Sequence, residues 1–240
     1  MHLTLPLAVV GVAVALTVAA LPTPRVLAAR AARAARADRP QSAPTERINL
    51  AERLAAGKLR VVNREATPTQ GRADGIHLSE REGIGIAWVE GTDFAQGSIE
   101  VEIRGRDVLQ QSFVGIAFHR RDDNTSEAVY LRPFNFRAED PVRHQHAVQY
   151  VLMPDFDWPR LRKEFPEEFE NPVDASIAPT AWVPVRIVVA AKTIQIYVGA
   201  VKTPTLEVRK LGALDRGMVG LWAGNMSDGD FANLRLTSAR

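Results

Sequence analysis

Hydrophobic and polar residues alternate along most of the chain from about residue 58 onward. The clearest example is residues 98–104, where Ile99, Val101 and Ile103 are separated by charged side chains. A period of two places alternate side chains on opposite faces of a β-strand. The pattern therefore predicts a strand with one face in a hydrophobic core and the other in solvent.

Further runs of the same kind follow, rich in Val, Ile, Phe and Tyr, with Gly, Asp, Asn, Ser or Pro between them. They cover residues 59–62, 75–78, 84–89, 113–119, 128–132, 147–152, 183–190, 193–198, 205–208, 218–223 and 231–236. β-branched and aromatic residues favour strands, and the polar gaps favour turns. We expect an all-β chain folded as a two-sheet antiparallel jelly-roll sandwich. The predicted core contains Ile99, Val101, Ile103, Val114, Ile116, Phe118, Val185, Ile187, Val189, Ile196, Val198 and Leu221.

One segment, residues 154–173, departs from the strand pattern. Asp157 is placed to cap a short helix that begins with Trp158 and Pro159 and ends before Pro166. An insertion of this length between two strands is typical of a rim or lid over one sheet. The sequence thus predicts a sandwich with a short helical insertion.

The N-terminus has a different composition. Residues 1–24 contain no Lys, Arg, Asp or Glu, and a small-residue site follows at residues 26–28. This pattern predicts a signal peptide over residues 1–28 and export to the periplasm or the extracellular space. Arginines follow the apolar run instead of preceding it, which leaves open an uncleaved N-terminal membrane anchor. An Ala/Arg-rich linker and lead-in over residues 29–57 and a sandwich domain over residues 58–240 complete the predicted organisation.

Composition and charge exclude several classes of function. The 240 residues include no Cys, which excludes disulfides, thiolate metal sites and cysteine nucleophiles. The formal net charge is +2, but four arginines and no acidic residue lie in the first 37 residues. The remainder carries 26 basic and 28 acidic residues, so we expect no nucleic-acid partner.

Several segments resemble strands of the concanavalin A-like lectin/glucanase superfamily. They are residues 97–105, 113–118, 182–189 and 194–198, and the ending 217–224 followed by 231–236. The chain is similar to the laminin-G-like branch and to the 3-keto-disaccharide hydrolase domain over about residues 59–238. The resemblance implies a jelly roll whose concave sheet face receives carbohydrate. Fold alone does not settle activity.

Polar residues suited to sugar binding gather near three consecutive predicted strands and the insertion that follows them. Arg, Asn, Gln and Tyr exchange hydrogen bonds with hydroxyls, and aromatic rings cover the apolar face of a pyranose. The predicted substrate-binding residues are Tyr130, Arg132, Asn135, Gln149, Trp158 and Arg160. We expect an exported carbohydrate-binding or carbohydrate-processing domain; a structural or interaction domain without a glycan ligand is the alternative.

Whether the protein is an enzyme stays open at this stage. Glycosidases commonly use two carboxylates, and Glu100 and Glu102 lie two residues apart on one strand face, although a solvated charged face explains this row more simply. His119 and His146 are the other catalytic candidates, as proton shuttles. If the protein is an enzyme, the resemblance implies a glycoside hydrolase-like activity, including on 3-keto sugars.

Metal binding is a further hypothesis. His144 and His146 share a side of a predicted extended segment, and His119 completes a trio that suits a divalent ion. Asp228 and Asp230 flank a glycine and offer oxygen ligands for calcium. A plain polar rim and an ordinary turn are the respective alternatives.

Overall fold

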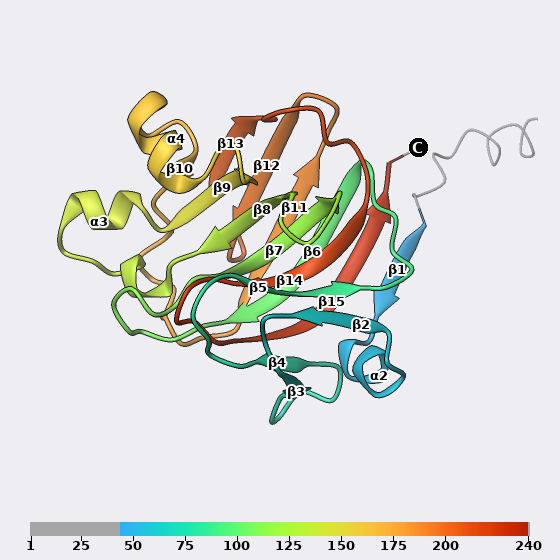
Figure 1. Cartoon of the computed structure of the whole chain (residues 1–240). Helices are drawn as coiled ribbons and strands as arrows, with labels where there is room; N and C mark the ends of the chain where they lie inside the picture. The colour runs from blue at the N-terminus through green and yellow to red at the C-terminus, as the bar shows by residue number, and fades with distance from the viewer. Residues whose placement is uncertain (1–43, 240) are drawn as a thin grey trace, which may run out of the picture. The chain divides into compact units, whose positions relative to one another are not determined.

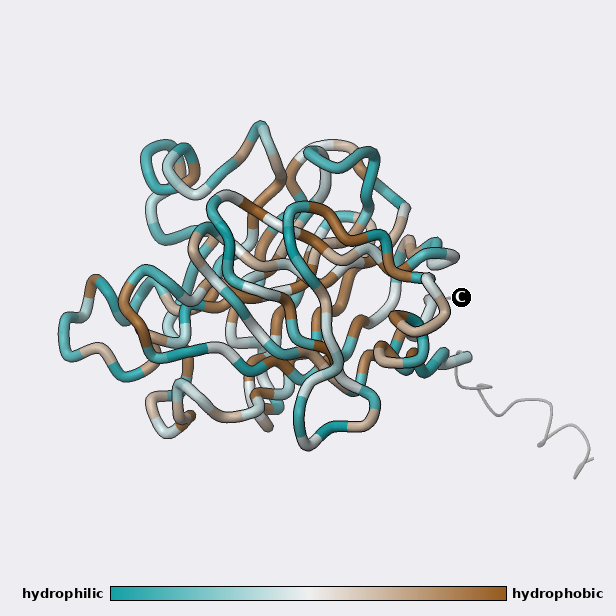
Figure 2. The backbone as a smooth tube through the Cα atoms, turned by 60° about the horizontal axis from the view of Figure 1, so that its bottom comes forward, coloured by the Kyte–Doolittle hydropathy of each residue, from teal (hydrophilic) through white to brown (hydrophobic). Residues whose placement is uncertain are grey.

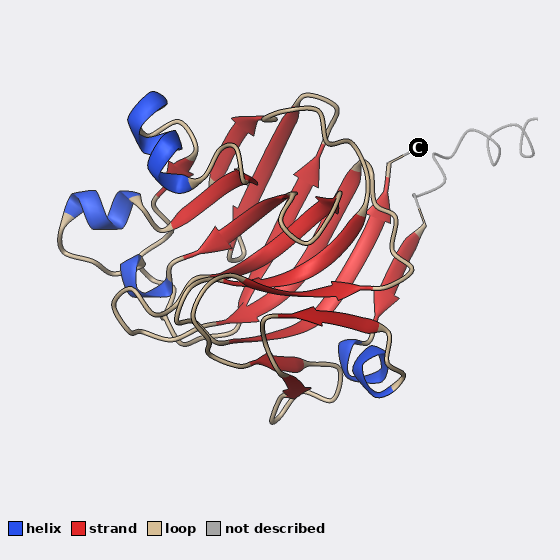
Figure 3. Cartoon of the chain, in the orientation of Figure 1, coloured by secondary structure: helices blue, strands red, loops and turns tan. Residues whose placement is uncertain are grey.

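A computed structural model describes residues 44–239 and shows two antiparallel β-sheets packed face to face (Figures 1 and 3). Sheet A runs in the order β13-β12-β11-β6-β15-β4-β3, with β1 also paired to β15. Its strands are β1 (Thr45–Ile48), β3 (Ala66–Pro68), β4 (Ile76–Leu78), β6 (Gly97–Arg104), β11 (Val183–Val189), β12 (Thr193–Val198), β13 (Leu206–Arg209) and β15 (Gly229–Ser238).

Sheet B runs in the order β10-β9-β8-β7-β14-β5-β2. Its strands are β2 (Leu59–Val62), β5 (Gly85–Val89), β7 (Val114–Arg120), β8 (Ser126–Leu131), β9 (Val148–Met153), β10 (Glu170–Asn171) and β14 (Met218–Ala223). The helices are short: α2 (Leu50–Ala55), the 3-10 turn η1 (Pro133–Asn135), α3 (Pro141–Gln145) and α4 (Trp158–Glu164). Helices α3 and α4 lie near β9 and β10, whereas α2 lies beside β3 and β15 (Figure 1). The predicted two-sheet antiparallel class is confirmed.

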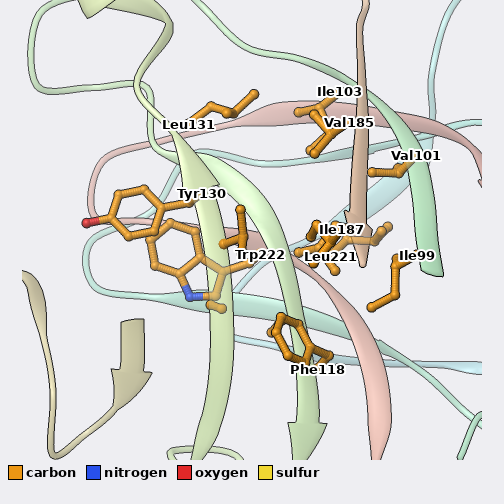
Figure 4. Close-up of a cluster of buried hydrophobic side chains, with 14 of the residues drawn as sticks. Ile99, Val101, Ile103, Phe118, Tyr130, Leu131, Val185, Ile187, Leu221 and Trp222 are labelled. Carbon is orange, nitrogen blue, oxygen red and sulfur yellow. The ribbon is translucent and has the colours of Figure 1, made fainter. Parts of the chain in front are cut away.

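The hydrophobic core fills the space between the sheets. Every predicted core residue is 3% exposed or less. In Figure 4 Ile99, Val101 and Ile103 of β6 face Val185 and Ile187 of the neighbouring strand, and hydrophobic stretches of backbone concentrate in the interior (Figure 2). The alternation that predicted these strands therefore follows from burial of one face of each sheet.

The folded domain begins earlier than residue 58. β1 pairs with β15, and α2 is capped by Asn49, whose side chain accepts a hydrogen bond from the Glu52 amide. Both elements lie in the region predicted as a lead-in. Three of the four β1 residues are exposed, so the strand shows no alternation and is held in place by its partner. The predicted signal peptide and most of the predicted linker lie outside the described residues.

Helix α4 lies where the sequence predicts a helix, and the predicted residue caps it. The Asp157 side chain accepts from the Arg160 amide, and a proline occupies the first turn. The segment before it differs from expectation: the sequence predicts that His144 and His146 share a side of an extended segment, but residues 141–145 form α3 and His146 is its C-cap. Asp140 caps α3 through the Val142 amide, and Pro141 occupies its first position, which favours a helix start. Within residues 44–239 no helix is long and apolar enough to cross a membrane.

Candidate functional site

A row of paired residues crosses the face of sheet B that points away from the core. Trp222, Gly115, Tyr130, Gln149 and Glu170 are successive register partners on β14, β7, β8, β9 and β10. Directly paired residues share a face, and their chain neighbours point to the other one. In Figure 4 Tyr130 and Trp222 accordingly lie side by side, apart from Leu221 and Ile187 in the core.

Aromatic rings form the floor of this face. The rings of Tyr130 and Trp222 stack with centroids 4.7 Å apart and an angle of 24° between their planes. Gly115 lies between them in the row, and a Cβ there would overlap the Val129 carbonyl oxygen and stand 2.6 Å from the Tyr130 Cα. Glycine is therefore required where these strands approach. Phe113 meets the Tyr130 ring edge-on at 6.3 Å.

The floor opens into a cavity of about 710 Å³. Strands β8, β9 and β14 supply its base, η1 and α3 one wall, and α4 another. Its lining residues are Ile84, Leu109, Gln110, Phe113, Tyr130, Arg132, Phe134, Asn135, Arg143, His146, Val151, Met153, Asp157, Trp158, Arg162, Trp222, Gly224 and Asn225. The size and the mixture of rings with a few polar groups suit a small organic ligand.

Arg132 organises the polar part of the floor. Its guanidinium donates to the His146 carbonyl at 3.0 Å, to the Tyr130 hydroxyl at 2.8 Å and to the Gln149 side-chain oxygen. Tyr130 in turn donates to the same Gln149 oxygen at 3.0 Å. Arg132 is only 4% exposed, and burial lowers the pKa of its guanidinium. The network fixes the direction of each donor before any ligand arrives.

Glu170 lies behind this network and was not predicted as a site residue. Its carboxylate is 2% exposed and binds Arg162 through both oxygens at 2.8–3.1 Å. Arg132 lies 3.8 Å away, and the His146 Nδ1 lies 2.8 Å from Oε1, out of line for a hydrogen bond. Burial lowers the pKa of His146, which keeps its imidazole neutral near pH 7. Glu170 thereby ties α4 to the edge of sheet B.

Comparison with known proteins identifies the fold. No protein-family model and no curated protein matches the chain. A carbohydrate-binding module, CBM66 from Bacillus subtilis, superposes with a TM-score of 0.53 at 12% identity, covering 75% of this chain and 96% of the module. A Bacillus licheniformis β-glucanase gives 0.50 at 10% identity, covering 84% and 100%. The Ca²⁺-bound exoplasmic/lumenal domain of VIP36 gives 0.52 at 10% identity, covering 76% and 84%.

The chain has a concanavalin A-like jelly-roll fold. The resemblance stated from the strand segments is thereby confirmed as a fold. Identities of 10–12% carry no information about residue roles, so the site must be judged from its own geometry.

Most predicted substrate-binding residues meet at the cavity of the jelly roll. Tyr130, Arg132, Asn135 and Trp158 line it, and Gln149 lies fully buried beneath. Asn135 donates to the His146 carbonyl at 3.1 Å.

Arg160 is the exception among the predicted substrate-binding residues. It binds the Asp155 carbonyl at 2.7 Å and the Glu164 carboxylate, and it is not part of the lining. Residues two apart on a helix face different directions, so α4 presents Arg162 to the cavity in its place. The structure therefore does not bring Arg160 together with the other predicted substrate-binding residues.

The carboxylate candidates Glu100 and Glu102 lie on the other side of the sandwich. They alternate with core residues of β6 and therefore occupy the outer face of sheet A, across the core from the cavity. Glu102 forms an ion pair with Arg72, and Glu100 lies 4.0 Å from Arg235. Surface ion pairs account for this row, and neither carboxylate reaches the cavity.

His119 also lies away from the cavity. It is fully buried, with Nδ1 2.8 Å from a Glu127 carboxylate oxygen and Nε2 2.7 Å from the Ala95 carbonyl oxygen. Tyr150 donates to the other Glu127 oxygen, and Lys210 lies 3.2 Å from the first. Each of these groups is engaged in a contact inside the protein. The structure therefore gives His119 a packing role and leaves His146 as the imidazole at the cavity.

The predicted histidine metal trio is not assembled. His119 is buried, His144 Nε2 lies 3.0 Å from the Val173 carbonyl oxygen, and His146 faces Glu170. In the described part of the chain, residues 44–239, no group of three or more His, Asp or Glu side chains is placed to hold a metal ion. The interpretation failed because residues 141–145 are helical and not extended.

The calcium candidates Asp228 and Asp230 are engaged by cationic side chains. Asp228 pairs with Arg106. Asp230 lies 2.9 Å from Arg104 and 3.2 Å from the His77 Nδ1. Oxygens neutralised in this way do not form a calcium site with the present side-chain arrangement.

The His77–Asp230 contact predicts a pH-dependent contribution to stability. A hydrogen bond to Asp230 raises the pKa of His77. Burial of Asp230 acts to raise the pKa of its carboxyl, but hydrogen bonds from His77, Thr69 and Arg104 outweigh burial and lower that pKa. Because the pKa of His77 is higher in the folded state, the contact stabilises the fold at pH values below the unfolded-state pKa of about 6.5. This stabilisation is lost as the pH rises through the folded-state pKa. Urea unfolding should show a larger stability difference between wild type and His77→Gln at about pH 5 than at about pH 9. Equal differences at both pH values would contradict this expectation.

Proposed function

We propose that the cavity on the outer face of sheet B binds carbohydrate. The observation that carries the proposal is the combination of rings on two sides of one cavity with fixed polar groups between them. Trp222 and Phe113 lie on the floor, and Trp158, which is 49% exposed, lies on α4. A pyranose presents an apolar face to such rings and hydroxyls at its edge. Two of the structural neighbours are a carbohydrate-binding module and a β-glucanase, which supports the same class of ligand.

The polar groups suit hydroxyl recognition. Asn135 and Arg132 are held by the His146 carbonyl, so their orientation is set in advance. The neutral imidazole of His146 can both donate to and accept from a hydroxyl. Groups fixed before binding lose little side-chain entropy when the ligand arrives.

Replacing Trp158 with alanine tests this proposal. The ring is half exposed and packs against Arg162 with the guanidinium 5.0 Å from its centroid, so its loss should leave the fold intact. We expect glycan affinity, measured by calorimetry on a ligand chosen from a glycan array, to fall about tenfold or more. Trp182→Ala is the matched control, because Trp182 packs against Arg72 and Arg104 and is not part of the cavity lining. Wild-type protein that binds no glycan, or a Trp158 variant that binds like wild type, would favour a structural domain without a glycan ligand.

Binding without two-carboxylate hydrolysis is the form of this function that we favour. Among the described residues Asp157 is the one carboxylate that lines the cavity, and its side chain caps α4. Glu170 is held by Arg162 behind the floor. A two-carboxylate mechanism needs a second acidic group facing the glycosidic bond.

Carbohydrate processing is a second candidate, favoured by His146. Its neutral imidazole lines the cavity and can accept a proton. Incubation with 3-keto-disaccharides, with and without a chelator, tests this candidate. Turnover that disappears in His146→Gln would establish processing, and turnover lost on chelation would revive a divalent-metal hypothesis.

We also propose that the domain is exported. The support is the charge-free apolar run over residues 1–24 and the small-residue site at residues 26–28. Mass spectrometry of the mature N-terminus tests it. A chain that keeps Met1 in a membrane fraction would favour the anchor.

A further inference from the structure

Arg143 carries a charge in the cavity that is not balanced by any acidic side chain of residues 44–239. It lies in the last turn of α3 and lines the cavity. Its Nε donates to the Asn135 side-chain oxygen at 3.4 Å and its Nη2 to the Phe134 carbonyl at 3.1 Å. Both acceptors are neutral, and no carboxylate within residues 44–239 forms a salt bridge with Arg143. Two contacts thus hold the guanidinium while its charge stays uncompensated.

The other charges of the cavity leave this excess in place. Arg132 and Arg162 share the single carboxylate of Glu170. Asp157 is the remaining acid and is engaged with the start of α4. His146 adds no positive charge near pH 7, because burial lowers its pKa. The guanidinium groups of Arg132, Arg143 and Arg162 therefore outnumber the two carboxylates, those of Glu170 and Asp157. They lie in a partly enclosed space, where charge interactions are stronger than in bulk water.

We infer that the ligand of this cavity carries an anionic group that binds Arg143. This inference rests on the proposed carbohydrate-binding function and specifies its ligand as a glycan with a uronate carboxylate or a sulfate ester. Arginine presents a planar fork of donors that matches the oxygens of either group, and its charge does not titrate in the physiological range. The neutral contacts to Asn135 and Phe134 orient that fork without neutralising it.

Calorimetry with three matched oligosaccharides tests the inference. The probes are a trigalacturonate, the same trimer after carboxyl reduction, and a sulfated galactose trimer. Wild-type protein should bind at least one anionic trimer about tenfold more tightly than the neutral one at low salt. The preference should weaken as sodium chloride is raised, because salt screens charge. Whether the trigalacturonate or the sulfated trimer binds more tightly then shows whether the site prefers a carboxylate or a sulfate.

Arg143→Gln should bring the ratio of anionic to neutral affinity close to one. Arg137→Gln is the matched control, since Arg137 likewise donates to two neutral acceptors, the backbone carbonyls of Ala175 and Ser176, but does not line the cavity. It should keep the wild-type ratio. A wild-type protein that binds all three trimers equally would overturn the inference and leave the carbohydrate proposal standing. Binding of no trimer and of no glycan on an array would overturn both.

Discussion

Replacing Arg132 with alanine should lower the free energy of unfolding by about 3–5 kcal/mol. The side chain is 4% exposed and donates to Tyr130, Gln149 and the His146 carbonyl. Its removal leaves the buried Gln149 oxygen with one donor fewer and leaves the buried Glu170 carboxylate with one cation fewer. Unsatisfied buried groups lose solvation without recovering a partner.

Chemical denaturation of wild type and the variant measures this loss. Arg137→Ala is the control, because its guanidinium lies at the surface and binds only backbone carbonyls. We expect that control to change stability by about 0.5 kcal/mol or less. An Arg132 variant with wild-type stability would show that the floor network contributes nothing to folding. Arg132 would then be a ligand-binding residue alone, as its position at the end of the predicted strand 128–132 first suggested.

The sequence predicts the sheets well because burial is imposed on alternate residues of each strand. Ile99, Val101 and Ile103 reveal β6 without any knowledge of its partners. Strands with exposed or very short sequences lack that signal, so β1 and β10 are visible only through their pairing with β15 and β9. Local pattern thus identifies strands that contribute to the core and misses those held by their neighbours.

The candidate site likewise contains residues that the sequence predicts and residues that only the tertiary structure reveals. Tyr130, Arg132 and Asn135 are near one another in the sequence, and their place at the end of one strand predicts that they share a site. Glu170 belongs to a run of acidic residues that resembles a solvated surface, and only its pairing with Gln149 brings it under the cavity. A buried carboxylate needs a cation, and Arg162 on a preceding helix supplies it. Such a contact depends on tertiary structure and leaves no periodic trace in the sequence.

The roles of charged residues are hard to predict from sequence when their partners are unknown. Glu100 and Glu102 have the spacing of a catalytic pair, yet alternation with the core places them on the outer face of sheet A. The alternation that predicts the strand also predicts that face. What it does not show is which sheet carries the cavity, because that depends on the order of strands. Here β14 is inserted between β5 and β7, and Trp222 is thereby brought beside Tyr130.

Gly115 connects the fold to the site, and its replacement by alanine should cost about 3 kcal/mol, at the upper end of the range for overpacking. A Cβ at this position would overlap the Val129 carbonyl oxygen and the backbone of Tyr130. These are main-chain atoms of the next strand, which cannot turn aside as a flexible side chain can. Strands β7 and β8 must separate, and the stack of Tyr130 on Trp222 must shift with them.

The Gly115→Ala variant should therefore lose both stability in denaturant and glycan affinity, since the floor of the cavity is built on that stack. Gly71→Ala provides the comparison. A Cβ at Gly71 would meet nothing within 4 Å, and its φ of +76° carries only backbone strain. That strain costs about 1 kcal/mol and leaves the cavity unchanged. Equal losses of stability in the two variants, with affinity retained in both, would mean that β7 and β8 have room to adjust. The close approach at Gly115 would then not be what brings Tyr130 and Trp222 together.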